Sequence, residues 1–267
     1  TIRRLGRAGI RCVCYNFMPV FDWLRSELHR PQPDGANALA YDEQTVLEMN
    51  PLHSELSLPG WDESYTKDSL KALLAEYESL DEKALFHNLA VFLEAVVPVA
   101  ESVGIRMAIH PDDPPWGIFG LPRIITCEEN LDRFLALVDS PANSLCLCTG
   151  SLGCAKSNDV AKMVRKYSAM GRIGFMHIRN VKIMDDGSFE ERAHLSSCGS
   201  LDIYEIVKAL VESGERVLLM AHHHAVMDIY KRELRALHPG FITGRETDKQ
   251  KDAAVSAFMS GKSDLVC

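Results

Sequence analysis

The stretch "IRMAIHPDDPP" (residues 105–115) begins as a mostly apolar run and ends in a histidine, two acids and three prolines. Its first five residues predict a buried β-strand. A plain turn after such a strand needs only one proline and one Asp or Asn. His110, Asp112 and Asp113 therefore indicate that this strand end carries chemistry as well as a change of direction.

Other apolar runs of the same kind recur along the chain, with amphipathic patterns typical of helices between them. The runs cover residues 10–17, 144–150, 173–180 and 216–224, and the helical patterns cover 83–104, 127–140, 158–171, 202–214 and 225–237. Strands that alternate with helices pair in parallel through right-handed crossovers, so the sequence predicts an α/β fold. Pro98 predicts a kink or a break in its helix. Residues 29–66, rich in Pro, Asp and Gly, predict a long connection with little regular structure.

Polar side chains follow the predicted strands at the point where each strand ends. These residues are Tyr15 and Asn16, His110 and Asp112, Cys148 and Thr149, His177 and Arg179, and His222 to His224. The active sites of parallel α/β folds lie at the carboxyl ends of the strands, where such side chains meet.

Three successive strand ends offer His110, Cys148 and His177, whose donor atoms suit a transition metal. The spacing of these residues along the chain is not a local metal-binding motif, so the prediction depends on the fold bringing them together. A lone histidine at a strand end is more often a structural residue with a satisfied hydrogen bond, and that alternative stays open for each of them.

The composition excludes several classes of protein. The chain has 267 residues, 46% of them hydrophobic and 25% charged, and a net charge of −8. This balance argues against a broad basic surface for nucleic acid. No run of about 18 apolar residues exists, so no transmembrane helix is expected. The N-terminus lacks the apolar core of a secretory signal, and because it does not start with Met we expect a segment of a longer chain.

Eight cysteines are present, several of them inside apolar runs, and no CxxC motif occurs. Reduced cysteines used as small buried side chains are typical of a cytoplasmic protein. We therefore expect a cytoplasmic location and no disulfide framework.

Several motifs resemble the mannonate dehydratase family over roughly residues 1–212. The motifs are "CYNFMPVFDW" (14–23), "RMAIHPDDPPWGIFGLPRII" (106–125), "CTGSLG" (148–153), "HIRN" (177–180) and "DIYEIVKALVE" (202–212). The resemblance implies a (β/α)8 TIM barrel similar to xylose isomerase. It also implies a lyase of hexuronate catabolism that dehydrates D-mannonate to 2-keto-3-deoxy-D-gluconate with Mn²⁺ or Fe²⁺. By motif, His110, Cys148 and His177 correspond to family metal ligands.

The chemistry of such a dehydration suggests roles for nearby polar residues. Asp112 or Asp113 could transfer protons, or both could simply hold a turn or orient a ligand histidine. Arg179 could clamp the substrate carboxylate through two hydrogen bonds, or could form a surface salt bridge. Tyr15, Asn16 and Arg123 could contact the substrate.

Two departures from the family are visible. Counting residues 10–17 as the fourth strand leaves only strands four to eight, so we expect an incomplete barrel with exposed edges. The last strand reads "LLMAHHHAVMD" (218–228), which places His223 where the family has an Asp ligand. His223 could replace that ligand, or the strand could end without binding metal.

The segment 214–267 has a predicted strand and helix, then "FITG" (241–244), a helix and another strand, and this order resembles the start of the C-terminal lobe of superfamily 2 helicases. The sequence therefore predicts two units, a partial barrel at 1–213 and a βαβαβ-like tail at 214–267. No GxxxxGK[ST] phosphate loop is present, so ATP hydrolysis is not expected. The alternatives to a dehydratase are an inactive fusion fragment and a helicase-lobe fragment that binds nucleic acid. The expected partner is a small sugar acid, with neither membrane nor nucleic acid; the sequence leaves open Mn²⁺, Fe²⁺ or Zn²⁺ and the oligomeric state.

Overall fold

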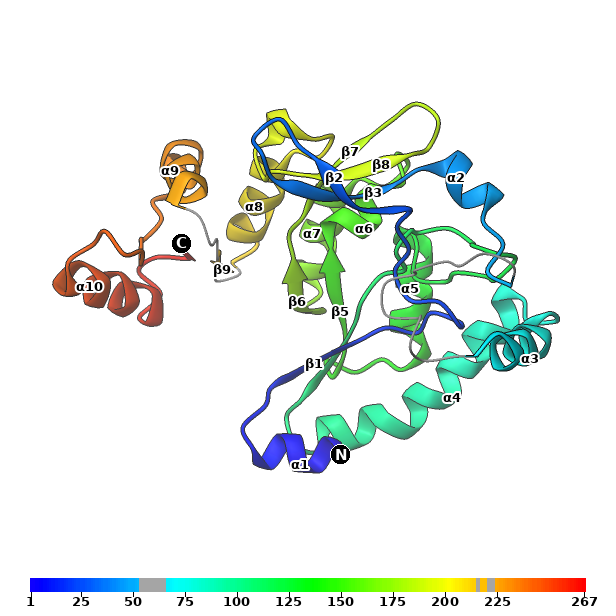
Figure 1. The fold of residues 1–267 in the computed structure, drawn as a ribbon. Helices are drawn as coiled ribbons and strands as arrows, with labels where there is room; N and C mark the ends of the chain where they lie inside the picture. Colours follow the sequence, from blue (N-terminus) through cyan, green and yellow to red (C-terminus); the bar gives the residue numbers. More distant parts are fainter. Residues whose placement is uncertain (53–65, 215–216, 220–223) are drawn as a thin grey trace.

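Four parallel strands form a curled sheet in the order β1-β4-β5-β6. The strands are β1 (Cys12–Tyr15), β4 (Arg106–Ile109), β5 (Asn143–Cys148) and β6 (Ile173–His177). The computed structural model describes residues 1–52, 66–214, 217–219 and 224–267 (Figure 1). Tyr15 pairs with Ile109 and Cys148 pairs with His177, so the carboxyl ends of neighbouring strands lie together. The fold is a mixed α/β fold with a curled half-barrel, in agreement with the predicted α/β class.

Four helices pack on this sheet: α4 (Glu82–Glu101), α5 (Glu128–Leu137), α7 (Val160–Ala169) and α8 (Ile203–Glu212). Three of them begin at an aspartate whose carboxylate accepts a backbone N–H of the first turn, namely Asp81, Asp159 and Asp202. One core cluster joins apolar side chains of these helices to those of the strands. Its fully buried members include Leu89, Leu93, Ile109, Phe134, Leu147 and Val164.

Helix α4 continues through Pro98 without a break. Of the kink or break predicted from this proline, the break does not occur. By length and composition alone, α4 is the one described helix that could cross a membrane. Six of its side chains, among them Leu89 and Leu93, are buried in the protein. Packing against the half-barrel thus accounts for its apolar face.

A second, antiparallel sheet has the order β2-β3-β8-β7. Its strands are β2 (Glu27–Pro31), β3 (Asn37–Tyr41), β8 (Phe189–Arg192) and β7 (Asn180–Ile183). The prediction of little regular structure in 29–66 was wrong for β2, β3 and α2 (Glu43–Glu48), and the β7–β8 hairpin was not predicted. The sheet forms because β3 pairs with β8, far away in the sequence, and Tyr41 stacks on Phe189 with ring centroids 5.0 Å apart. Figure 1 shows this sheet beyond the carboxyl ends of β5 and β6.

The C-terminal part forms a small sheet of its own. Strand β9 (Val217–Leu218) pairs in parallel with β10 (Leu265–Val266) and not with β6. Helices α9 (His224–Glu233) and α10 (Asp248–Met259) lie between these strands in sequence. Five barrel strands were expected in one sheet, whereas among the described residues the parallel sheet has four. The backbone of residues 217–219 takes its partners from β10, as in the 2.8 Å bond from Leu219 N–H to the Val266 carbonyl.

The remaining described elements are short or peripheral. They are α1 (Ile2–Arg7), α3 (Lys67–Tyr77), α6 (Thr149–Gly153), η1 (Ser196–Cys198) and η2 (Arg235–Leu237). Helix α6 matters most for the site, because it begins directly after β5 and carries its first turn over the end of that strand.

Candidate metal centre

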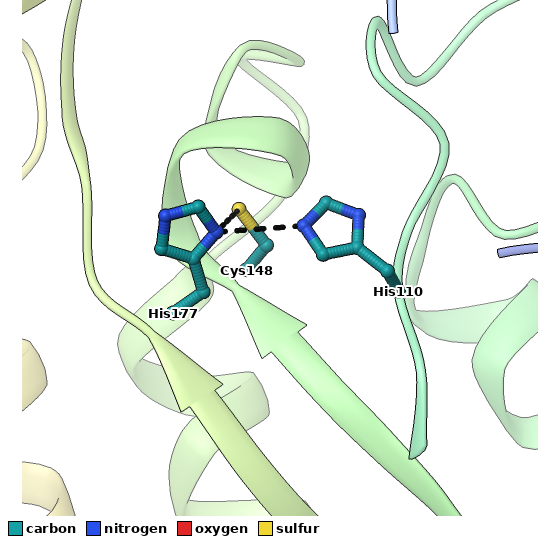
Figure 2. Close-up of side chains that lie close together, drawn as sticks. All are labelled: His110, Cys148 and His177. Atoms are coloured by element: carbon teal, nitrogen blue, oxygen red, sulfur yellow. Dashed lines mark hydrogen bonds between the residues drawn. The ribbon is translucent and has the colours of Figure 1, made fainter. Parts of the chain in front are cut away.

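His110, Cys148 and His177 come together at the carboxyl ends of β4, β5 and β6, as the sequence predicted. One potential ligand atom from each residue lies within 4.8 Å of the other two. Cys148 Sγ is 3.4 Å from His177 Nδ1, which is 3.5 Å from His110 Nε2 (Figure 2). Cys148 and His177 are register partners in adjacent strands, and the His110 N–H bonds the Tyr15 carbonyl of β1. Strand pairing thus positions these side chains.

The ring of His110 is oriented for metal binding. Its Nδ1 lies 2.7 Å from the carbonyl oxygen of Pro111. A carbonyl can only accept a hydrogen bond, so Nδ1 carries a proton and Nε2 is the ring nitrogen that faces the other two side chains. Metal-ligating histidines typically have such a backbone partner on the other ring nitrogen. The pair His110–Pro111 therefore fits a ligand role.

The electrostatics of the cluster favour a thiolate. Burial raises the pKa of the Cys148 thiol, but hydrogen bonds from His110 and His177 and the charge of Arg179 outweigh it and hold the pKa well below its usual value. Burial acts in the opposite direction on His110, yet its contacts with Cys148 and the Pro111 carbonyl raise the pKa of the imidazole to about 9. A thiolate and two imidazoles can bind Mn²⁺, Fe²⁺ or Zn²⁺, with an affinity that differs between these metals. They do not suit Ca²⁺ or Mg²⁺, which prefer oxygen ligands.

Asp113 stands behind this cluster in a buried ionic network. Arg25 donates from Nη1 to Oδ1 at 2.8 Å and from Nη2 to Oδ2 at 3.0 Å, and Arg179 Nη2 donates to Oδ2 at 2.6 Å. Arg179 also bonds Glu191 at 3.1 Å. Burial raises the pKa of Asp113, but the two guanidinium groups more than offset this and lower it. Arg179, predicted as a substrate clamp or a surface salt bridge, thus forms salt bridges with Asp113 and Glu191, and its own side chain is mostly buried.

Asp112 holds the chain that follows it. Its Oδ2 accepts the N–H groups of Ile124 and Ile125 at 2.7 and 2.8 Å, and its Oδ1 lies 3.9 Å from Arg123 Nη1. Burial raises the pKa of this carboxyl. Arg123 in turn donates from Nη2 to the carbonyls of Phe21 and Asp22. Asp112 Oδ2 thus holds the 124–125 segment, whereas its buried Oδ1 has no hydrogen-bond partner among the described residues.

The other predicted substrate contacts point elsewhere. The Tyr15 ring packs against Phe92 of α4 at 5.6 Å, and its buried hydroxyl has no hydrogen-bond partner among the described residues. Asn16 Nδ2 donates to Asp22 Oδ1 at 2.8 Å in an exposed position. None of the contacts described for Tyr15, Asn16 or Arg123 reaches the three ligand side chains. His223, the predicted fourth ligand, lies outside the described residues.

Three residues near the site were missed from the sequence. Ser151 lies 3.2 Å from Cys148 Sγ, and its position three residues after the cysteine in "CTGS" is a signal that could have found it. Arg25 reaches Asp113 from two residues before β2, and Glu191 reaches Arg179 from within β8. No local pattern marks them, because only the long-range pairing of that sheet brings them here.

Comparison with known proteins gives a consistent result. The family model of D-mannonate dehydratase (UxuA) matches residues 1–248. Mannonate dehydratase 2 of Halalkalibacterium halodurans is 50% identical over 80% of this chain and 62% of its own length. Mannonate dehydratase of Streptococcus agalactiae serotype V is 49% identical with the same coverage. The crystal structure of mannonate dehydratase from Streptococcus suis serotype 2 matches with a TM-score of 0.69 and 44% identity, covering 79% of this chain and 55% of that one.

The extent of these matches bears on the tail. The chain spans about 62% of the length of the curated relatives it matches. The family match continues to residue 248, well into the segment in which a helicase-like resemblance was expected from residue 214. None of the comparisons supports the predicted helicase resemblance of this segment.

Proposed function

The chain belongs to the D-mannonate dehydratase (UxuA) family, and on this premise we propose that it acts as a metal-dependent sugar-acid dehydratase. The reaction is removal of water from D-mannonate to give 2-keto-3-deoxy-D-gluconate, a step of hexuronate catabolism in the cytoplasm. One observation carries the proposal: two imidazoles and a thiolate from three neighbouring strand ends converge within 4.8 Å. The donor set fits a divalent transition metal, for which we propose Mn²⁺ or Fe²⁺.

The chemistry needs such a centre. Dehydration removes a weakly acidic proton beside a carboxylate and expels a hydroxide. When bound, a divalent cation supplies Lewis acidity toward substrate oxygens. His110, Cys148 and His177 would hold it, and the Pro111 carbonyl keeps the His110 lone pair directed inward.

Asp112, Asp113 and Arg179 form hydrogen bonds and ion pairs next to the three ligand side chains. Asp113 accepts from two guanidinium groups, and Asp112 Oδ2 accepts two backbone N–H groups, whereas the buried Asp112 Oδ1 has no hydrogen-bond partner among the described residues. We therefore assign Arg179 and Asp113 to organising the site, and keep Asp112 Oδ1 as the carboxylate oxygen of this set that is free for proton transfer. A substrate contact by Tyr15, Asn16 or Arg123 is not part of the proposal.

The architecture extends the same premise. The strands β1, β4, β5 and β6 are proposed to correspond to consecutive strands of a (β/α)8 barrel similar to xylose isomerase. The division into a partial barrel at 1–213 and a tail at 214–267 is retained as a proposal. It is supported by the separate pairing of β9 with β10.

Metal content tests the centre directly. After incubation with Mn²⁺ and dialysis, the protein is expected to retain about one ion per chain, since three protein ligands hold a catalytic metal. His110→Ala and Cys148→Ser should abolish retention. His87→Ala, an exposed histidine of α4, and Cys127→Ser, at the start of α5, are the matched controls and should retain the ion. Equal retention in all variants would overturn the metal centre.

Activity tests the substrate separately. Product formed from D-mannonate is followed as the 2-keto acid, with and without the metal. Metal-dependent product that is lost in Cys148→Ser supports the dehydratase. Metal retention without product would show that the site binds an ion but that the substrate assignment is wrong for this chain.

A further inference from the structure

Ser151 connects the buried ionic network to the candidate metal ligand. It is fully buried in α6, and its hydroxyl oxygen lies within hydrogen-bond distance of three groups. Cys148 Sγ is 3.2 Å away, Asp113 Oδ2 is 3.1 Å away, and Arg179 Nη2 is 3.2 Å away. Arg179 can only donate, so the hydroxyl accepts from it. A single proton then remains for either the carboxylate or the sulfur.

The hydrogen bonds that Asp113 and Cys148 already receive indicate which of them accepts the Ser151 hydroxyl proton. Asp113 Oδ1 already accepts from Arg25, and Asp113 Oδ2 accepts from both Arg25 and Arg179. The carboxylate is therefore well supplied with charged donors. The other hydrogen-bond neighbours of the Cys148 sulfur are His177 Nδ1, 3.4 Å away, and His110. When both histidines turn a lone pair to a cation, Ser151 is left as the donor to the sulfur among these neighbours.

We propose that Ser151 is a positioning residue for the metal-site thiolate, donating its hydroxyl proton to Cys148 Sγ while Arg179 and Asp113 hold the hydroxyl in place. The inference rests on the proposed metal centre and adds to it a residue that fixes the direction of the sulfur. A hydrogen bond to a thiolate ligand withdraws charge from the sulfur, and such outer partners tune both affinity and electronic properties of a metal.

Cobalt(II) is the probe, because thiolate-to-cobalt charge-transfer absorption in the near ultraviolet reports the electron density on sulfur. The Ser151→Ala protein is expected to show this band at longer wavelength than the wild type. Its Kd for Co²⁺ should rise by about tenfold, the lower end of the range for outer-shell partners. Ser151→Thr keeps the hydroxyl and should restore the wild-type band. Ser144→Ala is the matched control, since this buried serine donates to the Met107 carbonyl at 3.2 Å and not to Cys148.

The outcomes separate the two proposals. A wild-type protein without any thiolate–cobalt band would overturn the metal centre, and this inference with it. A normal wild-type band that stays at the same wavelength in folded, cobalt-loaded Ser151→Ala would overturn only the role of Ser151. If Ser151 only stabilised the fold, Ser151→Ala could lower stability but would not change the wavelength of the thiolate-to-cobalt band.

A second measurement covers the case in which Ser151→Ala does not fold. The cobalt–sulfur stretching frequency of the wild-type protein is recorded by resonance Raman spectroscopy after metal loading in H₂O and in D₂O. A hydrogen bond from an exchangeable hydroxyl predicts a shift in that frequency on deuteration. An identical frequency in both solvents would overturn the proposal without any variant.

Discussion

Asp113 is a buried carboxylate that neutralises two buried guanidinium groups at once. Arg25 and Arg179 both bond it, and the Asp113 and Arg25 side chains are almost fully shielded from solvent. Removing one partner of a buried ion pair leaves an uncompensated charge in a poorly polarisable environment. We expect Asp113→Asn to lower the free energy of unfolding by about 3–5 kcal/mol, measured by urea denaturation. Asp228→Asn is the control, because its pair with Arg245 is half-exposed and should contribute less than about 1 kcal/mol. Equal effects would contradict the network's role.

The same residue predicts a dependence of stability on pH. The pKa of Asp113 is lower in the folded protein than in the unfolded chain, because Arg25 and Arg179 favour the charged form. A group of this kind contributes its full stability above the unfolded pKa of about 3.9. That contribution is lost as pH falls through that value toward the folded pKa. Urea midpoints recorded from pH 7 to pH 3 should fall more steeply in the wild type than in Asp113→Asn. Parallel curves would show that the carboxyl is not coupled to folding.

At the level of the elements, the parallel strands and their helices were predictable because each has its own periodic pattern. The site followed from them: His110, Cys148 and His177 each end a strand, and parallel pairing brings strand ends together. The antiparallel sheet was not predictable in this way. Its strands are four or five residues long and partly polar, and β3 meets β8 only after most of the chain has intervened. Arg25 and Glu191 were missed for the same reason.

The aromatic contact between β3 and β8 of the antiparallel sheet predicts how much one side chain contributes to stability. Phe189 of β8 is fully buried, stacks on Tyr41 and lies 4.8 Å beneath the Arg25 guanidinium. Phe189→Ala removes a large core side chain and should cost about 3–5 kcal/mol of unfolding free energy. Phe175→Ala is the matched control, since that ring is 49% exposed and its loss should change stability little. Chemical denaturation of the two variants checks the difference, and a comparable loss in both would contradict the role of Phe189 in holding the sheet.

At the level of the whole molecule, a metal that binds the folded chain should stabilise all of it. The three ligands belong to strands separated by whole βα units, so they share a cation only when the sheet is formed. Free metal at a hundred times its Kd should add about 2.7 kcal/mol to the stability of the folded form. A rise of several degrees in Tm with Mn²⁺ is therefore expected for the wild type and not for Cys148→Ser. The same rise in both proteins would place the bound ion elsewhere.

The first 41 residues are held by pairing with later strands in both sheets, in addition to the covalent connection through the chain between them. Strand β1 pairs with β4 in one sheet and β3 pairs with β8 in the other, so the N-terminal segment is bound to the rest of the protein at two separate places. Hydrolysis of a peptide bond within α3 would leave both strand pairings intact. A nicked molecule should thus migrate as two bands under denaturing conditions and still travel as one particle in native buffer.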